Sequence, residues 1–419
     1  MIGNLRPLHP RHNYFRAGRK MINIVDRFFS FNRFLLLLIG LWPYKKSKYV
    51  QLQLICIFSF LISSIIFQLT TILTSKCTPE FIIKILSSAF IFSAFVIKYN
   101  AFYVNSTTVK YLTEQVQCMY NDLRDTKEIA IAERYGSNAK YYATSISSKT
   151  SLASFFFSGA FLFVAVQLLP EFRYFILSAN VSRSHHLRIS TEYFIDQERY
   201  FYLLFFHING TMILGCVVIA ATGTMLFTYL QHACGMFRIA SYRIEKAIQT
   251  YTSKNVKVQD DILAHKDIIR AIDIHREAIT FSNYLISKFE ISFMFLIAFG
   301  VIGLSLNIFR VFQVALFGYN IEELFINLVF ATLTFLYMFL ANFVGQQIID
   351  HNNHVYATAY KVQWYVTPLH IQRLILLILQ RGNKSFGLSV GGLFIASIEC
   401  FATLTNASVS YFTIMYSMR

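Results

Sequence analysis

Seven long apolar stretches constrain the fold of this chain more than any other feature. They are residues 50–74, 81–103, 150–170, 203–230, 290–316, 323–345 and 388–416. Each reaches the roughly 20 residues that a helix needs to cross a hydrocarbon layer about 30 Å thick. Only 14% of the 419 residues are charged and 55% are apolar, too little charge to cover a soluble domain of this size. The sequence predicts an all-α membrane protein with seven transmembrane helices.

The basic residues between these stretches indicate the orientation. Lys and Arg concentrate in the cytoplasmic loops of membrane proteins. With the N-terminus in the cytoplasm, the inner segments hold 29 of the 38 basic residues and the outer segments hold 6. We therefore expect a cytoplasmic N-terminus and an extracellular C-terminus. The same distribution accounts for the net charge of +16 without a nucleic-acid partner. Asn180 begins a glycosylation sequon in the longest outer loop and is the candidate for modification.

The stretches and loops divide the chain into six predicted segments. These are a cytoplasmic segment (1–49), transmembrane helices one to four (50–230), a cytoplasmic helical extension (231–289), helices five and six (290–345), a second cytoplasmic segment (346–387) and helix seven (388–419). Within the first segment, Phe34 to Trp42 is too short to span, so we expect a helix lying at the inner interface and ending at Pro43.

The 231–289 segment has apolar residues at helical spacing, including Ile244, Ile248, Ile268 and Ile272. Transmembrane helices four and five are therefore expected to continue into the cytoplasm. Together with the amphipathic piece Val362–Ile378, they are expected to form a packed anchor domain. A set of solvated helical loops is the alternative.

Enzyme and metal signatures give no support to catalysis. The phosphate-binding Gly-rich loop, the His-Glu-x-x-His motif and paired-Cys zinc spacing are missing. His351 and His354 beside Asp350 suggest a metal cluster, but a polar helix end at the inner membrane face is the favoured interpretation. We expect no enzyme activity, no cofactor and no metal.

Several short motifs, in order along the chain, resemble those of insect odorant receptors. They are His232-Ala233-Cys234-Gly235 with Arg243-Ile244-Glu245, Ser305-Leu306-Asn307, Gly345-Gln346-Gln347, Tyr360-x-x-x-Trp364-Tyr365 and Ser410-Tyr411-Phe412-Thr413. The resemblance extends over the whole chain in length and in the number and order of the stretches. The inverted topology is also typical of that family.

The resemblance implies a ligand-gated, non-selective cation channel in the plasma membrane of an olfactory sensory neuron. In that family four subunits surround one pore lined by helix seven, and a tuning subunit pairs with a shared coreceptor in a heterotetramer. This chain resembles a tuning subunit, because it lacks the coreceptor's long insertion after helix four. The implied partners are the coreceptor, membrane lipid and a small, volatile, apolar ligand.

The family's gate implies roles for residues on helix seven. It is a pair of apolar residues three and seven positions beyond a Tyr, which here are Ile414 and Met418 after Tyr411. Residues four apart share a helix face, and a ring of apolar side chains closes a pore by dewetting. Simple packing in the membrane is the alternative.

Charged residues within the stretches need separate explanations. Glu399 is costly if it faces lipid, so it either lines a cation pathway or forms a structural hydrogen bond, for example with Thr403. Lys84, Lys98 and Arg310 are interpreted as side chains that extend to a membrane surface, with no further role.

The ligand pocket of the family lies in the outer half of each subunit, among helices two, three, four and six. The corresponding aromatic and hydroxyl residues are Phe90, Phe92, Phe157, Phe161, Phe205, Phe206, Thr211, Phe335 and Tyr337. Aromatic walls with few hydroxyls suit a small volatile molecule that is recognised by shape. For each Phe singly, packing against lipid or core is the alternative.

Three other classes remain open. A gustatory receptor would share the fold, but its Gln-Phe pair is absent after Tyr411. A G-protein-coupled receptor has the opposite orientation, and neither Asp-Arg-Tyr after helix three nor Asn-Pro-x-x-Tyr in helix seven is present. A transporter usually has paired repeats and helices broken by Gly or Pro. None of the six prolines interrupts a stretch.

Overall fold

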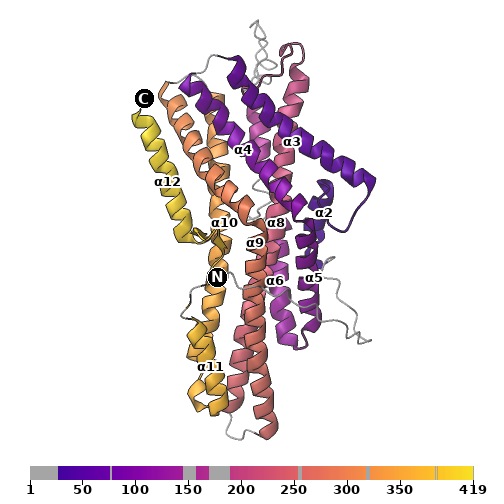
Figure 1. Ribbon diagram of the computed structural model, residues 1–419, viewed down its shortest axis with the longest axis vertical. Helices are drawn as coiled ribbons and strands as arrows, with labels where there is room; N and C mark the ends of the chain where they lie inside the picture. The colour runs from indigo at the N-terminus through magenta and orange to yellow at the C-terminus, as the bar shows by residue number, and fades with distance from the viewer. Residues whose placement is uncertain are drawn as a thin grey trace.

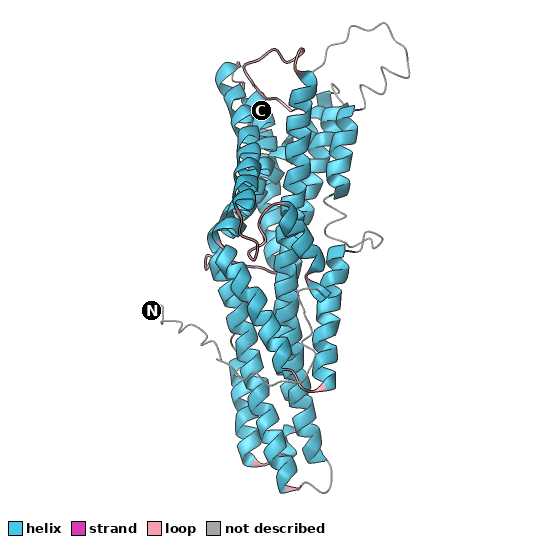
Figure 2. Cartoon of the chain, turned by 90° about the vertical axis from the view of Figure 1, so that its right-hand side faces the viewer, coloured by secondary structure: helices cyan, strands magenta, loops and turns pink. Residues whose placement is uncertain are grey.

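The chain folds into an elongated bundle of helices, which we describe from a computed structural model (Figures 1 and 2). The structure describes residues 27–75, 78–144, 157–168, 189–252, 257–317, 321–382, 384 and 386–418. The helices, with a short 3-10 turn η1, are α2 (Ser30–Leu38), α3 (Lys48–Thr74), α4 (Pro79–Val104), α5 (Ser106–Asp122), α6 (Thr126–Thr144), α8 (Phe201–Thr252), α9 (Val258–Phe317), α10 (Ile321–Lys361), η1 (Trp364–Val366), α11 (Leu369–Gly382) and α12 (Ile398–Ser417). The strands are β1 (Ser389–Val390) and β2 (Phe394–Ile395).

The molecule has two halves that follow one another along its long axis (Figure 1). The apolar half comprises α3, α4, the helical residues 157–168, residues 201–230 of α8, 290–317 of α9, 321–345 of α10, and α12. The stalk half comprises α5, α6, residues 231–252 of α8, 258–289 of α9, 346–361 of α10, and α11. Three helices run through both halves without a break, so the two halves are mechanically continuous.

The apolar half contains the helices that are suited to a membrane. Five described helices, α3, α4, α8, α9 and α10, are long and apolar enough to cross one. They include five of the seven predicted stretches, which confirms the helical character of those stretches. The helix at residues 157–168 is shorter and is the described part of the third predicted stretch. Side-chain caps start α3 and α4: Ser47 accepts a hydrogen bond from the amide of Val50, and Thr78 from that of Phe81.

The seventh stretch begins later than predicted. Residue 388 was the expected start, but α12 begins at Ile398, after the antiparallel hairpin of β1 and β2. Gly391 and Gly392 adopt φ of 63° and 68°, the left-handed region in which glycine has no Cβ penalty. These two residues turn the chain before the helix can start. Ser397 then caps α12 by accepting a hydrogen bond from the amide of Cys400 at 3.1 Å.

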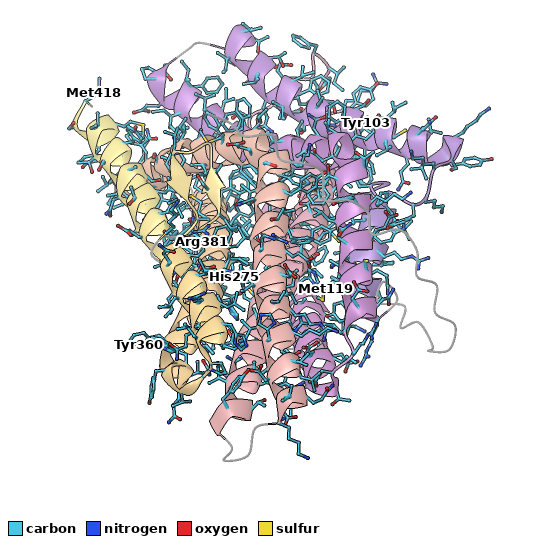
Figure 3. The ribbon with its side chains drawn as sticks, turned by 60° about the horizontal axis from the view of Figure 1, so that its bottom comes forward. Tyr103, Met119, His275, Tyr360, Arg381 and Met418 are labelled. Carbon is cyan, nitrogen blue, oxygen red and sulfur yellow. The ribbon has the colours of Figure 1, made fainter. Side chains whose placement is uncertain are left out.

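The stalk half has a continuous buried core. Ile244 of α8, Ile268 of α9 and Ile375 of α11 are fully buried in it, as the helical spacing of the sequence predicts for the first two. Burying one such side chain stabilises a fold by about 1.5–3 kcal/mol. The extensions of α8 and α9 are therefore packed helices, and the alternative of solvated loops is wrong. Figure 3 shows His275 within this half and Tyr360 at its far end.

Ion pairs fasten α6 to the stalk core. Arg243 of α8 donates two hydrogen bonds to Glu128 of α6, at 2.7 and 2.9 Å, in the parallel geometry of a bidentate pair. Both side chains are largely buried, with exposures of 14% and 9%. Lys246 donates to Asp125 at 2.7 Å, and this hydrogen bond lowers the pKa of the Asp125 carboxyl. Arg243-Ile244-Glu245 is thus a motif whose first two residues fix the stalk.

The first amphipathic helix packs into the protein. We expected an interfacial helix over Phe34–Trp42, but α2 covers Ser30–Leu38 and its Leu35 and Leu36 are buried. Asn32 donates a hydrogen bond to Thr228 of α8 at 2.8 Å. This buried hydrogen bond between side chains fixes α2 against α8.

Candidate functional site

A small cavity lies between the beginnings of α4 and α10. The segment that follows residue 188 covers it, and this segment is held in place by backbone and side-chain hydrogen bonds. Glu192 donates its amide proton to the carbonyl of Phe67 at 2.8 Å, and the Tyr193 hydroxyl lies 2.7 Å from Nδ1 of His207. The cavity is lined by Lys84, Ser87, Ser88, Ile189, Ser190, Glu323, Ile326, Asn327 and Phe330. Six of these nine residues are polar or charged.

A partly buried charge network forms one side of the cavity. Glu323 of α10 forms an ion pair with Arg310 of α9 and lies 3.3 Å from Nζ of Lys84 on α4. Arg310 also donates to Gln313 at 2.5 Å, and its side chain is only 9% exposed. Three helices are thus joined by opposite charges near one end of the apolar half.

This network corrects the interpretation of the charged residues in the stretches. Arg310 and Lys84 meet Glu323 and do not simply extend to a surface. Lys98 is also enclosed, with 4% exposure, and its ammonium lies 5.3 Å from the ring of Phe293 and 5.4 Å from that of Tyr337. Contacts with aromatic faces stabilise a buried cation in that position. Sequence reasoning missed these contacts because pairing across helices has no local pattern.

The predicted ligand-binding residues occupy several environments. Phe92 and Thr211 are buried, whereas Phe161 and Phe206 are 73% and 68% exposed on the outside of their helices. The others are partly buried or lie at the surface: Phe90, Phe157, Phe205, Phe335 and Tyr337. The nine side chains do not converge on the described cavity, whose aromatic wall is Phe330 instead.

The ring contacts show where some of the predicted residues point. Phe90 packs edge-on against Phe299 of α9 at 5.0 Å between ring centroids. Phe335 of α10 packs edge-on against Phe401 of α12 at 5.1 Å. Phe335 is therefore positioned between the bundle and α12.

Helix α12 packs against the bundle in its first half and is largely exposed towards its C-terminal end. Leu404 is buried in a cluster with α9 and α10, and Ser408 is also buried. Tyr411, Ile414 and Met418 are 54%, 53% and 82% exposed further along the helix, in its C-terminal half. Figure 3 shows Met418 at the free end of α12, far from the stalk. The three residues predicted for the gate are thus all exposed in this subunit, in the C-terminal half of α12.

Glu399 lies in the first turn of α12. Its side chain is exposed, and the hydroxyl of Thr403 donates to its backbone carbonyl at 3.0 Å. Thr403 therefore hydrogen-bonds to the backbone carbonyl of Glu399 and not to its carboxylate. The positive end of the helix dipole also stabilises an acidic group in the first turn.

The Gly345-Gln346-Gln347 motif holds the start of α12 against α10. A Cβ atom at position 345 would lie 2.3 Å from the carbonyl oxygen of Ala396, so only glycine permits this approach. Gln346 accepts a hydrogen bond from the amide of Ile398 at 3.3 Å. One turn earlier, Asn342 accepts from the amide of Ser397 at the same distance. Helix α10 thus supplies acceptors to the unpaired amides at the start of α12.

Gly387-Leu388-Ser389-Val390-Gly391 has the spacing of a hydrolase nucleophile elbow, which the sequence interpretation overlooked. Ser389 lies on β1 opposite Ile395, and the chain continues into a hairpin turn. A nucleophile elbow requires a strand followed directly by a helix. The structural context of this chemistry is therefore missing.

The histidines at the end of the predicted sixth stretch make ordinary packing contacts. His351 lies 2.8 Å from the hydroxyl of Tyr135, and His354 lies 2.9 Å from the guanidinium of Arg238. No group of His, Cys, Asp or Glu within the described part of the chain could hold a metal ion. The polar helix end is the interpretation that these contacts favour. Asn180, the predicted glycosylation site, lies outside the described residues.

Long apolar helices that continue into a packed stalk define a helical membrane protein. Comparison with known proteins makes the class more specific. Residues 78–409 match the family model of the 7tm odorant receptors. The chain belongs to this family, and the resemblance to insect odorant receptors is confirmed.

Individual relatives are distant in sequence and close in fold. Odorant receptor 10 of Aedes albopictus is 23% identical over 206 residues, which are 48% of this chain and 51% of that protein. The match therefore spans about half the length of that relative. The olfactory receptor OR5 of Machilis hrabei in complex with eugenol has a TM-score of 0.74 at 13% identity, and the match covers 96% of this chain and 100% of that one. The same receptor without eugenol gives 0.72 at 13% identity, covering 94% and 99%.

Proposed function

We propose that this chain is the odorant-binding subunit of a ligand-gated, non-selective cation channel. It spans the plasma membrane of an olfactory sensory neuron seven times, with its N-terminus and stalk half in the cytoplasm. It acts as a tuning subunit in a heterotetramer with the odorant coreceptor. Three observations support this proposal: the chain belongs to the odorant receptor family, its fold resembles that of OR5, and its basic residues concentrate in the predicted inner segments.

The observation that carries the proposal is the exposure of the C-terminal half of α12. Tyr411, Ile414 and Met418 expose apolar surface in a single subunit, although Leu404 and Ser408 earlier in the helix are buried. Around a fourfold axis, copies of this half would meet as an apolar ring that closes the pore by dewetting. Hydroxyl-bearing residues elsewhere on α12, such as Thr403 and Ser410, suit a helix that borders water.

The contacts between α10 and α12 supply a route from ligand to gate. A ligand that enters between α4 and α10 would displace α10. Phe335 touches α12 directly, and Asn342 and Gln346 hold its first turn. Movement of α10 would therefore draw α12 outward and widen the ring at Ile414. Glu399 would lie at the cytoplasmic mouth of the pore, where a carboxylate attracts cations.

Two surfaces define the remaining partners in this proposal. Exposed apolar side chains such as Phe161 and Phe206 would contact membrane lipid. The stalk half would hold the subunits together as an anchor. Asn180, in the outer loop, would be the glycosylated residue.

Whole-cell recording in cells that express this chain with an insect coreceptor tests the proposal. A panel of volatile compounds should evoke inward cation current that persists when G-protein signalling is blocked. Ile414→Ala should change gating, with raised basal current or a shifted odorant dependence. Ile66→Ala is the matched control, because Ile66 is similarly exposed (51% against 53%) but lies on α3. Responses that require a second messenger, or equal effects of both substitutions, would contradict the proposal.

A further inference from the structure

A cluster of lysines lies beside the start of α3, where the apolar half meets the stalk half. It comprises Lys45, Lys46 and Lys48, at or just before the first residue of α3, and Lys110 of α5. We infer that this lysine cluster binds the negatively charged headgroups of phospholipids in the inner leaflet of the membrane. The inference rests on the proposed orientation of the chain and adds a binding surface to it.

Hydrogen bonds of the segment between α2 and α3 fix the position of the cluster. The side-chain amide of Gln53 donates to the carbonyl of Leu38 at 2.8 Å, and the hydroxyl of Tyr99 on α4 donates to that of Ile39 at 3.1 Å. Figure 1 shows α2, the start of α3 and the start of α5 at one level, where the two halves meet. In the proposed topology this level is the inner surface of the membrane, where phospholipid headgroups lie.

Tyr44 brings Lys110 to the same surface. The hydroxyl of Tyr44 donates to the carbonyl of Lys110 at 3.4 Å, and the centre of its ring lies 5.6 Å from the Lys110 ammonium. Lys110 also pairs with Glu114, but the two side chains are exposed and their charged atoms are 3.8 Å apart. Because an exposed pair of this kind contributes little, the Lys110 ammonium can still attract an anion.

Little negative charge balances the cluster. Residues 27–79 include six basic residues and neither Asp nor Glu. Lys45, Lys46 and Lys48 are exposed, and their ammonium groups form no ion pair with any residue that the structure describes. Basic clusters next to a transmembrane helix, on its cytoplasmic side, are attracted to anionic lipids. The charge of the cluster thus complements that of an anionic headgroup.

Exposed apolar side chains next to the cluster favour a membrane lipid over a soluble anion. Tyr49, Leu52 and Ile55 are 83%, 61% and 64% exposed in the first turns of α3. Their spacing of three residues places them along one side of the helix, and Tyr is enriched where membrane meets water. The acyl chains of a phospholipid would contact this side while its phosphate contacts the lysines. A soluble phosphate would use the lysines alone.

Native mass spectrometry of the purified full-length protein with short-chain lipids tests the inference. Dioctanoyl phosphatidylserine and dioctanoyl phosphatidylinositol bisphosphate should bind more tightly than dioctanoyl phosphatidylcholine. One lysine near an anionic lipid surface corresponds to about a fivefold change in affinity. The triple variant Lys45→Gln, Lys46→Gln, Lys48→Gln should therefore weaken binding of the two anionic lipids by about 100-fold. Its binding of phosphatidylcholine should be unchanged.

The triple variant Lys127→Gln, Lys266→Gln, Lys361→Gln is the matched control. It removes the same charge from three exposed lysines of the stalk half, away from the start of α3. Its affinity for each lipid should equal that of wild type.

A second pair of variants changes the charge of the cluster without removing a lysine. Ser47 lies between Lys46 and Lys48 and caps α3, because its hydroxyl accepts a hydrogen bond from the amide of Val50 at 3.3 Å. Asp and Asn both preserve such a cap, but only Ser47→Asp adds a negative charge. Ser47→Asp should weaken binding of the anionic lipids by about fivefold, whereas Ser47→Asn should match wild type.

Three results would overturn the inference. Equal losses in the two triple variants would show that net charge alone controls binding. Equal affinities of Ser47→Asp and Ser47→Asn would show that the bound lipid does not sense the charge of the cluster. Displacement of the lipid by an equal concentration of soluble inositol trisphosphate would assign the cluster to a soluble anion. Since the assay uses neither coreceptor nor odorant, a failure of lipid binding leaves the channel proposal standing, and an absence of odorant-evoked current leaves the lipid site standing.

Discussion

The stalk half and the apolar half use apolar side chains in opposite ways. In the stalk half, Ile244 and Ile248 of α8 are 0% and 2% exposed, in a core that they share with α9 and α11. In the apolar half, Ile55 and Leu73 of α3 are 64% and 85% exposed. A helix in water can present only one apolar stripe, so the stripe identifies the packed face. A helix in lipid can be apolar on every face, so its composition indicates a span but not its neighbours.

The apolar half should be most sensitive where two backbones touch, because lipid supplies no other force to hold them together. Gly345→Ala places a Cβ 2.3 Å from the carbonyl oxygen of Ala396, a backbone atom that cannot move aside easily. Overpacking of this kind costs about 1–3 kcal/mol, so we expect odorant-evoked current to fall by about tenfold or more. Recording with surface labelling measures the effect per channel.

Gly223→Ala is the control for this substitution, since a Cβ at Gly223 of α8 meets nothing within 4 Å. Its current should match that of wild type. If Gly345→Ala also leaves the current unchanged, the close approach of α10 to the start of α12 does not control gating.

The stalk half should depend more on specific charge pairing. Arg243→Met leaves the carboxylate of Glu128 buried without its bidentate partner, and breaking such a pair costs about 3–5 kcal/mol when it is fully buried. At exposures of 14% and 9%, we expect the lower end of this range, measured as a fall in the melting temperature of the purified protein. The double variant with Glu128→Gln should recover part of the loss.

Arg276→Met is the comparison for the stalk, because Arg276 and Asp273 form a similar pair at 3.2 Å on the exposed surface of the same half. Exposed pairs are worth about 0–1 kcal/mol. Equal destabilisation by Arg243→Met and Arg276→Met would show that burial of the first pair adds nothing.

The contrast between the halves explains what the sequence could predict. Helical spacing placed Ile244 and Ile268 in a shared core, and the structure buries both. Composition located the five long apolar helices, but it could not distinguish the exposed Phe161 and Phe206 from the buried Phe92. The ion pairs of Glu323 with Arg310 and Lys84 join different helices, and no local sequence pattern predicts them. The hairpin before α12 was missed because its apolar residues continue the hydropathy of the helix.

The smallest expected effect concerns the response of the stalk to acid. His275 is 8% exposed, and Nε2 lies 3.0 Å from Oδ1 of Asn352. Burial lowers the pKa of His275; the hydrogen bond with Asn352 opposes this shift, and the charge of Arg381 adds to it. The ring of Tyr356 lies 5.5 Å away and supplies no negative charge at neutral pH. The protonated imidazole is therefore poorly accommodated in the folded stalk.

The sign of the pH dependence follows from this lowered pKa. In the unfolded chain, His275 takes up a proton near its ordinary pKa of about 6.5, whereas the folded chain resists until lower pH. The unfolded state thus binds more protons just below pH 6.5, and stability decreases there by at most about 1.4 kcal/mol per pH unit. His275→Gln should flatten the fall in melting temperature between pH 7.5 and 5.5. An equal slope in the variant would mean that other groups carry the acid sensitivity, and that the stalk tolerates a charge at its centre as the apolar half does at Lys98.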